Sequence, residues 1–187
     1  MSSEISVPVD LCLDGPLWQF AGQLWSRPAA QEAALSLQQR GWSVTDILCA
    51  LWLASQGRRF TGYGNGQVTL WRTRVTEALR NARKTISKGN AATDKARGCI
   101  AHSELEAEKV ELALAHSALT RHSAPGGPAA QRNAAPHQSY GTTVKTFALE
   151  NLQAAAPEKA MDNETGRLLE CLIGELQCLP EEASQSC

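Results

Sequence analysis

Two sets of charged residues have types and spacings that could build a polar site. Arginines and glutamates recur toward the apolar sides of two predicted helices: Arg72, Arg80, Arg83, Glu104, Glu108 and Glu111. Because an unpaired charge is costly to remove from water, we expect the arginines to pair with the glutamates across two antiparallel helices. The set is then either a structural ion-pair seam that fixes helix register or a polar ligand pocket between the helices.

A metal site is the next chemistry to consider, because Glu104 and Glu108 lie one helical turn apart. Bundles that bind metals through bridging carboxylates use Glu-x-x-His on paired helices, and this sequence has no such motif. The histidines are scattered along the chain: His102, His116, His122 and His137. We therefore predict no metal and no cofactor.

The other motifs indicate no catalytic site. Residues 62–66, GYGNG, follow Arg58 and Arg59 and resemble a phosphate-binding loop, but no strand precedes them and the Walker lysine is missing. The G-x-S-x-G and H-E-x-x-H signatures are absent as well. We predict no catalytic residues, and enzyme activity stays an open alternative.

The charged residues must be positioned by helices. Ser43 and Asp46 form a capping box that predicts a helix start at Val44. The run ILCALWLA at residues 47–54 has no polar face, which is typical of a central, buried helix. Gly57 ends this helix after about a dozen residues, whereas a membrane span needs roughly 20.

Two helices are expected before the central helix and two after it. Pro16 and Pro28 mark the first two starts. The fourth helix is predicted to run to about Ser87 and the fifth from about Asp94 to Leu119. An apolar face is predicted on the fourth helix: Leu70, Trp71, Val75, Ala78, Leu79, Ala82 and Ile86. Since no segment alternates like a strand, we predict an all-α, single-domain bundle of about five core helices plus two C-terminal helices.

The domain boundaries follow from composition. We place a helical core domain at residues 14–119 and a flexible linker at 120–143, because residues 121–143 are rich in Pro, Gly, Ser and Ala. The two C-terminal helices occupy residues 144–179 and are expected to pack on the core. Residues 1–13 and 180–187 are predicted to be disordered tails.

Overall composition is that of an ordinary globular protein, with 43% hydrophobic residues, 20% charged residues and a net charge of -1. The first ten residues, MSSEISVPVD, lack the features of a targeting segment, so we expect a cytoplasmic protein without membrane association. The 6 cysteines include no C-x-x-C pair, which favours reduced thiols over a disulfide framework.

Positive charge is concentrated in residues 57–97, which permits either internal pairing or a nucleic-acid surface. Residues 29–55 have the outline of a helix-turn-helix, but from Val44 to Ala54 the second helix offers only Thr45 and Asp46 as polar side chains. A nucleic-acid surface would therefore have to use other basic side chains: Arg58, Arg59, Arg74, Arg80, Lys84 and Lys88.

Three blocks of the sequence resemble a known family: LWQFAGQLWSRPAAQEAALSLQQRGWSVTDILCALWLASQG, LWRTRVTEALRNARK and SELEAEKVE. They are similar to an uncharacterised proteobacterial family of small helical cytoplasmic proteins, domain of unknown function 2390. The resemblance rests on the following residues: Trp18, Phe20, Arg27, Pro28, Leu37, Gln38, Trp52, Leu53, Trp71, Arg72, Leu79, Arg80, Arg83, Glu104 and Glu108. Trp25 stands where we expect a tyrosine, and the segment after Arg121 looks like an insertion. The resemblance implies no activity, cofactor or catalytic residue.

The function predicted from these observations is that of a noncatalytic, cytoplasmic, bacterial helical protein. It would act as a regulator or adaptor through contacts with an unknown protein partner, because the 5 tryptophans and the striped last helix offer apolar surface. Two alternatives stay open. One is an enzyme or anionic-ligand-binding protein with an Arg/Glu pocket between the fourth and fifth helices, and the other is nucleic-acid binding through the basic fourth helix.

Overall fold

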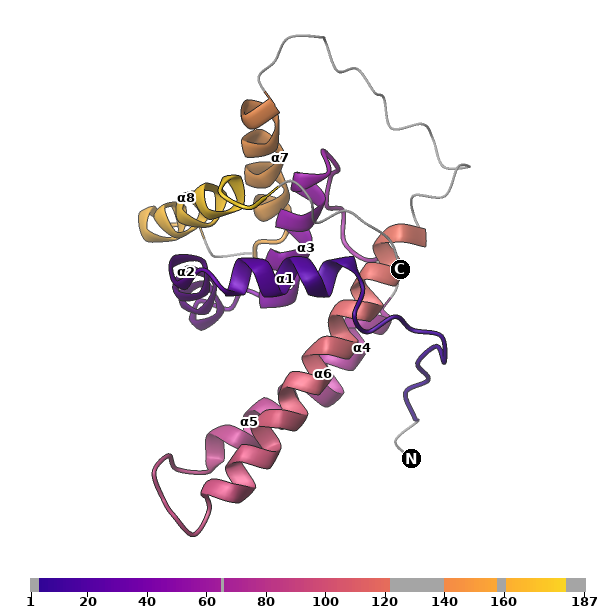
Figure 1. Cartoon of the computed structure of the whole chain (residues 1–187), viewed down its shortest axis with the longest axis vertical. Helices are drawn as coiled ribbons and strands as arrows, with labels where there is room; N and C mark the ends of the chain where they lie inside the picture. The colour runs from indigo at the N-terminus through magenta and orange to yellow at the C-terminus, as the bar shows by residue number, and fades with distance from the viewer. Residues whose placement is uncertain (1–3, 65, 122–139, 158–160, 181–187) are drawn as a thin grey trace.

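A computed structural model describes residues 4–64, 66–121, 140–157 and 161–180 (Figure 1). Within these ranges every element of regular structure is a helix and there is no strand, which confirms the predicted all-α fold. The greater part of the predicted linker and the last seven residues lie outside the described residues. None of the described helices is long and apolar enough to cross a membrane.

The first three helices are short and closely packed. They are α1 (Pro16–Trp25), α2 (Pro28–Gln39) and α3 (Val44–Ser55). A proline begins each of the first two helices, where its missing N–H costs no hydrogen bond. The Ser43 side chain caps α3 by accepting a hydrogen bond from the Asp46 N–H at 3.2 Å. Nearly all of α3 is buried, as its uninterrupted apolar run predicts.

The predicted fourth helix is one rod with a widened turn in its middle. It consists of α4 (Gln67–Trp71), the π-helical turn η1 (Arg72–Thr76) and α5 (Glu77–Thr85). Its end falls at Thr85 instead of Ser87, and the π turn was not predicted. Such π-helical turns are rare in proteins, and many of those that occur lie at functional sites.

Helix α6 (Asp94–Arg121) is 28 residues long and returns alongside α5 in a helical hairpin. We call residues 77–103 the arm, because this part of the hairpin extends away from the other helices (Figure 1). Arg97 stabilises the turn by donating to the last carbonyls of α5, those of Arg83 and Ile86.

The apolar face predicted for the fourth helix is only partly buried. No residue of α5 is buried, and Ala82 is exposed. The physical reason is that α5 packs only on α6 and η1, so no helix of the body covers its other sides. The side of α6 at the arm is open in the same way, and Leu105 is 48% exposed.

The C-terminal helices α7 (Tyr140–Ala154) and α8 (Asn163–Gln177) pack on α3 and α2, respectively. Asn151 joins α7 to the end of α3, because its side chain bonds to the backbone at Ala50, Arg58 and Phe60. On the other side, Arg27 forms an ion pair with Glu175 of α8. In front of α1, residues 4–13 are irregular, and Val7 and Leu11 pack against the core.

The start of α8 supplies a pH-dependent contribution to stability. Asp162 accepts a hydrogen bond from the Thr165 N–H at 2.7 Å and one from Arg40 at 2.8 Å. The bond from Thr165, together with Arg40, lowers the pKa of Asp162 from 3.8 to about 2. A depressed carboxyl pKa stabilises the fold above the unfolded value and ceases to do so as pH falls through the folded value.

We therefore expect wild type to be more stable than the uncharged cap variant Asp162→Asn at neutral pH, with a difference that shrinks between pH 4 and pH 2. Urea unfolding of both proteins across this range measures the difference, and titrating groups remote from Asp162 cancel in the comparison. A difference that is the same at pH 7 and pH 2 would show that Asp162 has no such role.

Candidate functional site

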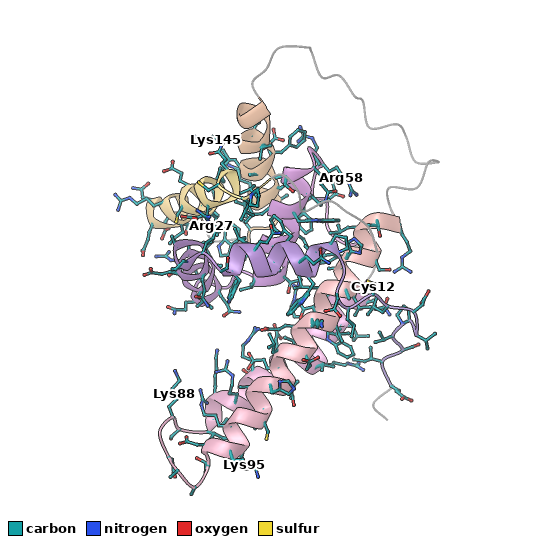
Figure 2. The ribbon with its side chains drawn as sticks, in the orientation of Figure 1. Cys12, Arg27, Arg58, Lys88, Lys95 and Lys145 are labelled. Atoms are coloured by element: carbon teal, nitrogen blue, oxygen red, sulfur yellow. The ribbon has the colours of Figure 1, made fainter. Side chains whose placement is uncertain are left out.

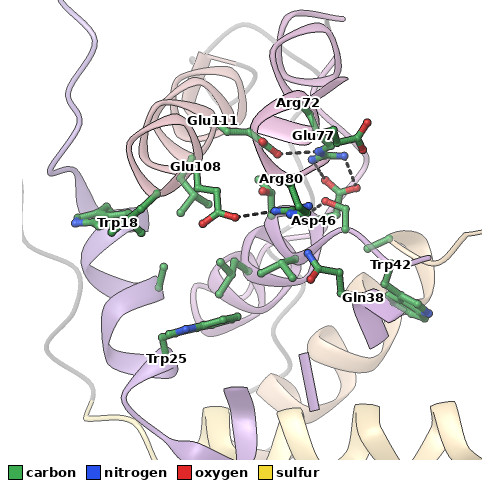
Figure 3. Close-up of a pocket in the computed structure, with 18 of the residues that line it drawn as sticks. Trp18, Trp25, Gln38, Trp42, Asp46, Arg72, Glu77, Arg80, Glu108 and Glu111 are labelled. Atoms are coloured by element: carbon green, nitrogen blue, oxygen red, sulfur yellow. Dashed lines mark hydrogen bonds and ion pairs between the residues drawn. The ribbon is translucent and has the colours of Figure 1, made fainter. Parts of the chain in front are cut away.

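Glu111 is the centre of a buried polar network under the π turn. Its side chain is on α6 and the residue is only 1% exposed. It accepts hydrogen bonds from Arg72 Nε at 2.7 Å and from Thr76 Oγ1 at 2.8 Å, so both ends of η1 bind one carboxylate. Arg72 also holds Asp46 of α3 through two nitrogens, at 2.7 and 3.2 Å, and Tyr63 donates its hydroxyl to Asp46. We call these five residues the Glu111 network, and Figure 3 shows three of them, Asp46, Arg72 and Glu111.

Two members of the Glu111 network, Arg72 and Tyr63, are held in their protonated forms. Burial alone acts to lower the pKa of Arg72, but the hydrogen bonds and charges of Asp46 and Glu111 outweigh this and raise the pKa above its ordinary value. Burial raises the pKa of Tyr63 well above its ordinary range, so the hydroxyl keeps its proton and remains a donor. Arg72 is therefore a fixed cation.

A second cluster of charges lies one to two turns away along α6. Arg80 donates to Glu104 at 3.0 Å and to Glu108 at 2.7 Å, and Arg83 donates to both oxygens of Glu104. We call these four residues the Arg80 cluster. Glu104 is buried, whereas the Glu108 side chain is 37% exposed.

The two glutamates of the Arg80 cluster differ in their environments. Burial acts to raise the pKa of Glu104, but hydrogen bonds from Arg83 and Arg80 overcome it and lower the pKa below its ordinary value. Burial raises the pKa of Glu108, the single bond from Arg80 opposes it only in part, and Glu104 and Glu111 repel its charge. Of these two glutamates, Glu108 is therefore the one whose negative charge is less fully balanced by arginine.

The structure brings together the six charged residues of the predicted arginine–glutamate set. Each of the three arginines pairs with at least one of the three glutamates: Arg72, Arg80, Arg83, Glu104, Glu108 and Glu111. Sequence reasoning missed the other members of the Glu111 network. Asp46 had been interpreted only as a helix cap, and no sequence signal places Tyr63 and Thr76 beside it. A carboxylate on an otherwise apolar helix could have been a clue to Asp46.

Beside these charges lies a pocket with a volume of about 800 Å³. One wall carries the aromatic side chains and comes from α1 and from residues 41–48 before and within α3, and the other comes from η1, α5 and α6 (Figure 3). Three tryptophans border it: Trp18, Trp25 and Trp42. Six charged residues line it: Asp46, Arg72, Glu77, Arg80, Glu108 and Glu111. The pocket thus combines apolar faces with a few fixed charges, as ligand sites do.

A second hollow of about 610 Å³ adjoins the pocket toward the arm. It adds Leu35 of α2, Arg83 of α5 and residues from the first half of α6. The two hollows share six residues: Trp25, Gln38, Val44, Arg80, Leu105 and Glu108. The two together form a cleft between the arm and the body of the protein.

Other candidates for chemistry lie outside this cleft. Cys49 is fully buried near the Tyr63 hydroxyl, and burial raises its pKa far above the ordinary value, which leaves an unreactive thiol. His116 packs edge-on against Trp52, and neither residue lines the pocket. In the described part of the chain, no three His, Cys, Asp or Glu side chains are grouped so that they could hold a metal ion.

Fold and site define an all-α protein with a ligand-sized pocket between a helical hairpin and a helical body. The chain belongs to the family described as protein of unknown function (DUF2390), whose model matches residues 16–114. That match spans α1 to most of α6 and contains every charged residue of the Glu111 network and the Arg80 cluster. Comparisons with curated proteins and with solved structures found no match.

Proposed function

We propose that this protein binds a small organic molecule in the pocket between α1, α3, the π turn and α6. The observation that carries the proposal is the combination of a volume of about 800 Å³ with three bordering tryptophans. Ligand pockets in proteins have volumes of about 300–1,000 Å³ and are lined by apolar and aromatic groups with a few placed polar side chains.

The polar side chains of the pocket are fixed in advance, which favours specific binding. Arg72 is held by two carboxylates from two helices, and Arg80 is held by two more. Binding of a ligand therefore costs little conformational entropy of the arginine side chains. Preformed sites bind more tightly for this reason.

Binding is better supported than catalysis. The described residues that line the pocket include no histidine, cysteine or lysine, the side chains that most often act as bases or nucleophiles. Burial raises the pKa of Glu108, but this side chain accepts its hydrogen bond from Arg80, a permanent cation that cannot accept a proton.

The regulator or adaptor role predicted from the sequence stays a prediction. Its support is limited to exposed apolar side chains at the cleft, where Leu35 and Leu105 line the second hollow. Leu70 and Leu149 are exposed as well, but they belong to α4 and α7.

Nucleic-acid binding also stays a prediction, and the basic residues on which it depends are dispersed. Arg58 donates to a backbone carbonyl of α6, Arg59 pairs with Glu150, and Arg80 pairs with carboxylates of α6. Lys88 lies at the tip of the arm, whereas Arg58 lies on the body (Figure 2).

The proposal is tested by screening metabolites for an increase in the melting temperature. Saturation at 100 times Kd is worth about 2.7 kcal/mol, which is readily detected. We expect at least one compound whose affinity falls about tenfold or more in Trp25→Leu, because aromatic side chains at the centre of a site dominate binding.

The control for this screen is Leu149→Ala, which removes an exposed apolar side chain of α7 outside the pocket. Its affinity for the same compound should equal that of wild type. If no compound binds, or if every compound that binds has the same affinity for Trp25→Leu as for wild type, the pocket is not the binding site.

A further inference from the structure

Each arginine of the pocket already balances two internal carboxylates. Three nitrogens of Arg72 donate to Asp46 and Glu111, and Arg80 donates through Nε and Nη2 to two glutamates. An anionic ligand would compete with these carboxylates for the same positive charge. Such competition leaves a carboxylate that is partly or fully buried with less positive charge around it, which is unfavourable.

Acidic side chains outnumber basic side chains in the lining of the pocket. Four carboxylates line it against two guanidinium groups: Asp46, Glu77, Glu108, Glu111, Arg72 and Arg80. Glu108 accepts through Oε1 from Arg80, and its other oxygen has no hydrogen-bond partner within the described ranges of the chain. The direction of its pKa, raised by burial and by neighbouring glutamates, agrees with a shortage of positive charge around it.

The aromatic wall of the pocket is also suited to a positively charged ligand. Trp18 and Trp25 come from α1 and border the pocket on the side from which Glu108 reaches toward Arg80 (Figure 3). Trp18 already carries the ammonium group of Lys109 at 5.4 Å from its ring centre. Indole faces attract cations more strongly than other aromatic side chains do, and the attraction grows when water is excluded.

From the acidic excess, the unpartnered Glu108 oxygen and the tryptophan wall, we infer that the ligand is an organic cation. It has an ammonium group that pairs with Glu108 and an apolar body that packs on Trp25. This inference rests on the proposed function and names its ligand class. It replaces the anionic ligand that the sequence analysis kept open as an alternative because of the arginines.

Calorimetric titration with probes of matched shape tests the sign of the charge. Tryptamine, 3-methylindole and indole-3-acetate share an indole ring and are cationic, neutral and anionic at neutral pH, and benzyltrimethylammonium supplies a second cation. We expect both cations to bind, tryptamine about tenfold or more tightly than 3-methylindole, and indole-3-acetate least tightly.

Glu108→Gln separates the charge from the shape of the site. Glutamine keeps an acceptor for Arg80 but has no charge, so we expect tryptamine to lose about tenfold in affinity and to approach the affinity of 3-methylindole. The matched control is Glu106→Gln, which removes the same charge from an exposed position of α6 outside both hollows and should leave binding unchanged.

The outcomes distinguish this inference from the proposed function. If 3-methylindole or indole-3-acetate binds as tightly as tryptamine and binding is lost in Trp25→Leu, the organic cation is wrong and the pocket stands. Equal losses in Glu108→Gln and Glu106→Gln, or no binding of either cation, also overturn the inference. The proposed function itself fails only if no compound in the metabolite screen depends on Trp25.

Discussion

The Arg72→Ala variant is expected to lose about 3–5 kcal/mol of unfolding free energy, since removing one partner of a buried ion pair leaves an uncompensated charge. Arg72 is the cation that serves both Asp46 and Glu111, and the Glu111 side chain is only 2% exposed. Without the guanidinium, two desolvated carboxylates face each other across α3 and α6. Urea unfolding followed by circular dichroism measures the loss.

Arg74→Ala is the control for this prediction, because Arg74 is an exposed residue on the same π turn. We expect it to change stability by no more than about 1 kcal/mol, the range of an exposed charge contact. Arg72→Lys should fall between the two, because lysine keeps the charge but cannot bond two carboxylates through a planar fork. Equal stability of Arg72→Ala and Arg74→Ala would mean that the Glu111 network is solvated and does not fix the site.

The Asn151→Ala variant is expected to lose about 2–4 kcal/mol, because a buried backbone group left without a partner costs about 1–3 kcal/mol. Asn151 is 1% exposed. It accepts from the Phe60 N–H at 2.8 Å and donates to the carbonyls of Ala50 and Arg58 at 3.0 and 2.8 Å. Alanine breaks all three bonds and leaves a cavity.

The effect of this variant should extend to the pocket, since Ala155 and Ala156, which directly follow α7, line it. We expect weaker ligand binding in Asn151→Ala together with the lower unfolding free energy. Gln153→Ala changes an exposed residue of the same helix and is expected to affect neither. If Asn151→Ala unfolds like Gln153→Ala, α7 is held to α3 by other contacts.

Local signals made much of the helical body predictable. The Ser43 cap, Pro16, Pro28 and the apolar run of α3 each act within a few residues, so their effects can be inferred from sequence. The pairing of arginines with glutamates was predictable for a different reason. Charges on apolar helix faces require partners, and the sequence places arginines on one helix and glutamates on the next helix of a predicted antiparallel pair.

The pocket could not be predicted in the same way. It depends on how far the arm stands from α1 and α2, which is a tertiary property. The apolar pattern of α5 predicted a buried face, whereas the structure leaves that face half covered and Leu105 exposed beside the cleft. The π turn, in which Arg72 and Thr76 both bind Glu111, has no sequence signature.

A crystal structure of the protein purified from its own host would test the ligand site most directly. We expect an open cleft between the arm and α1, with Arg72 bound to Asp46 and Glu111. Density for an organic molecule should lie against Trp25 with a positively charged group at Glu108. A structure in which the arm closes onto α1 and the protein's own side chains fill the pocket would contradict the ligand site.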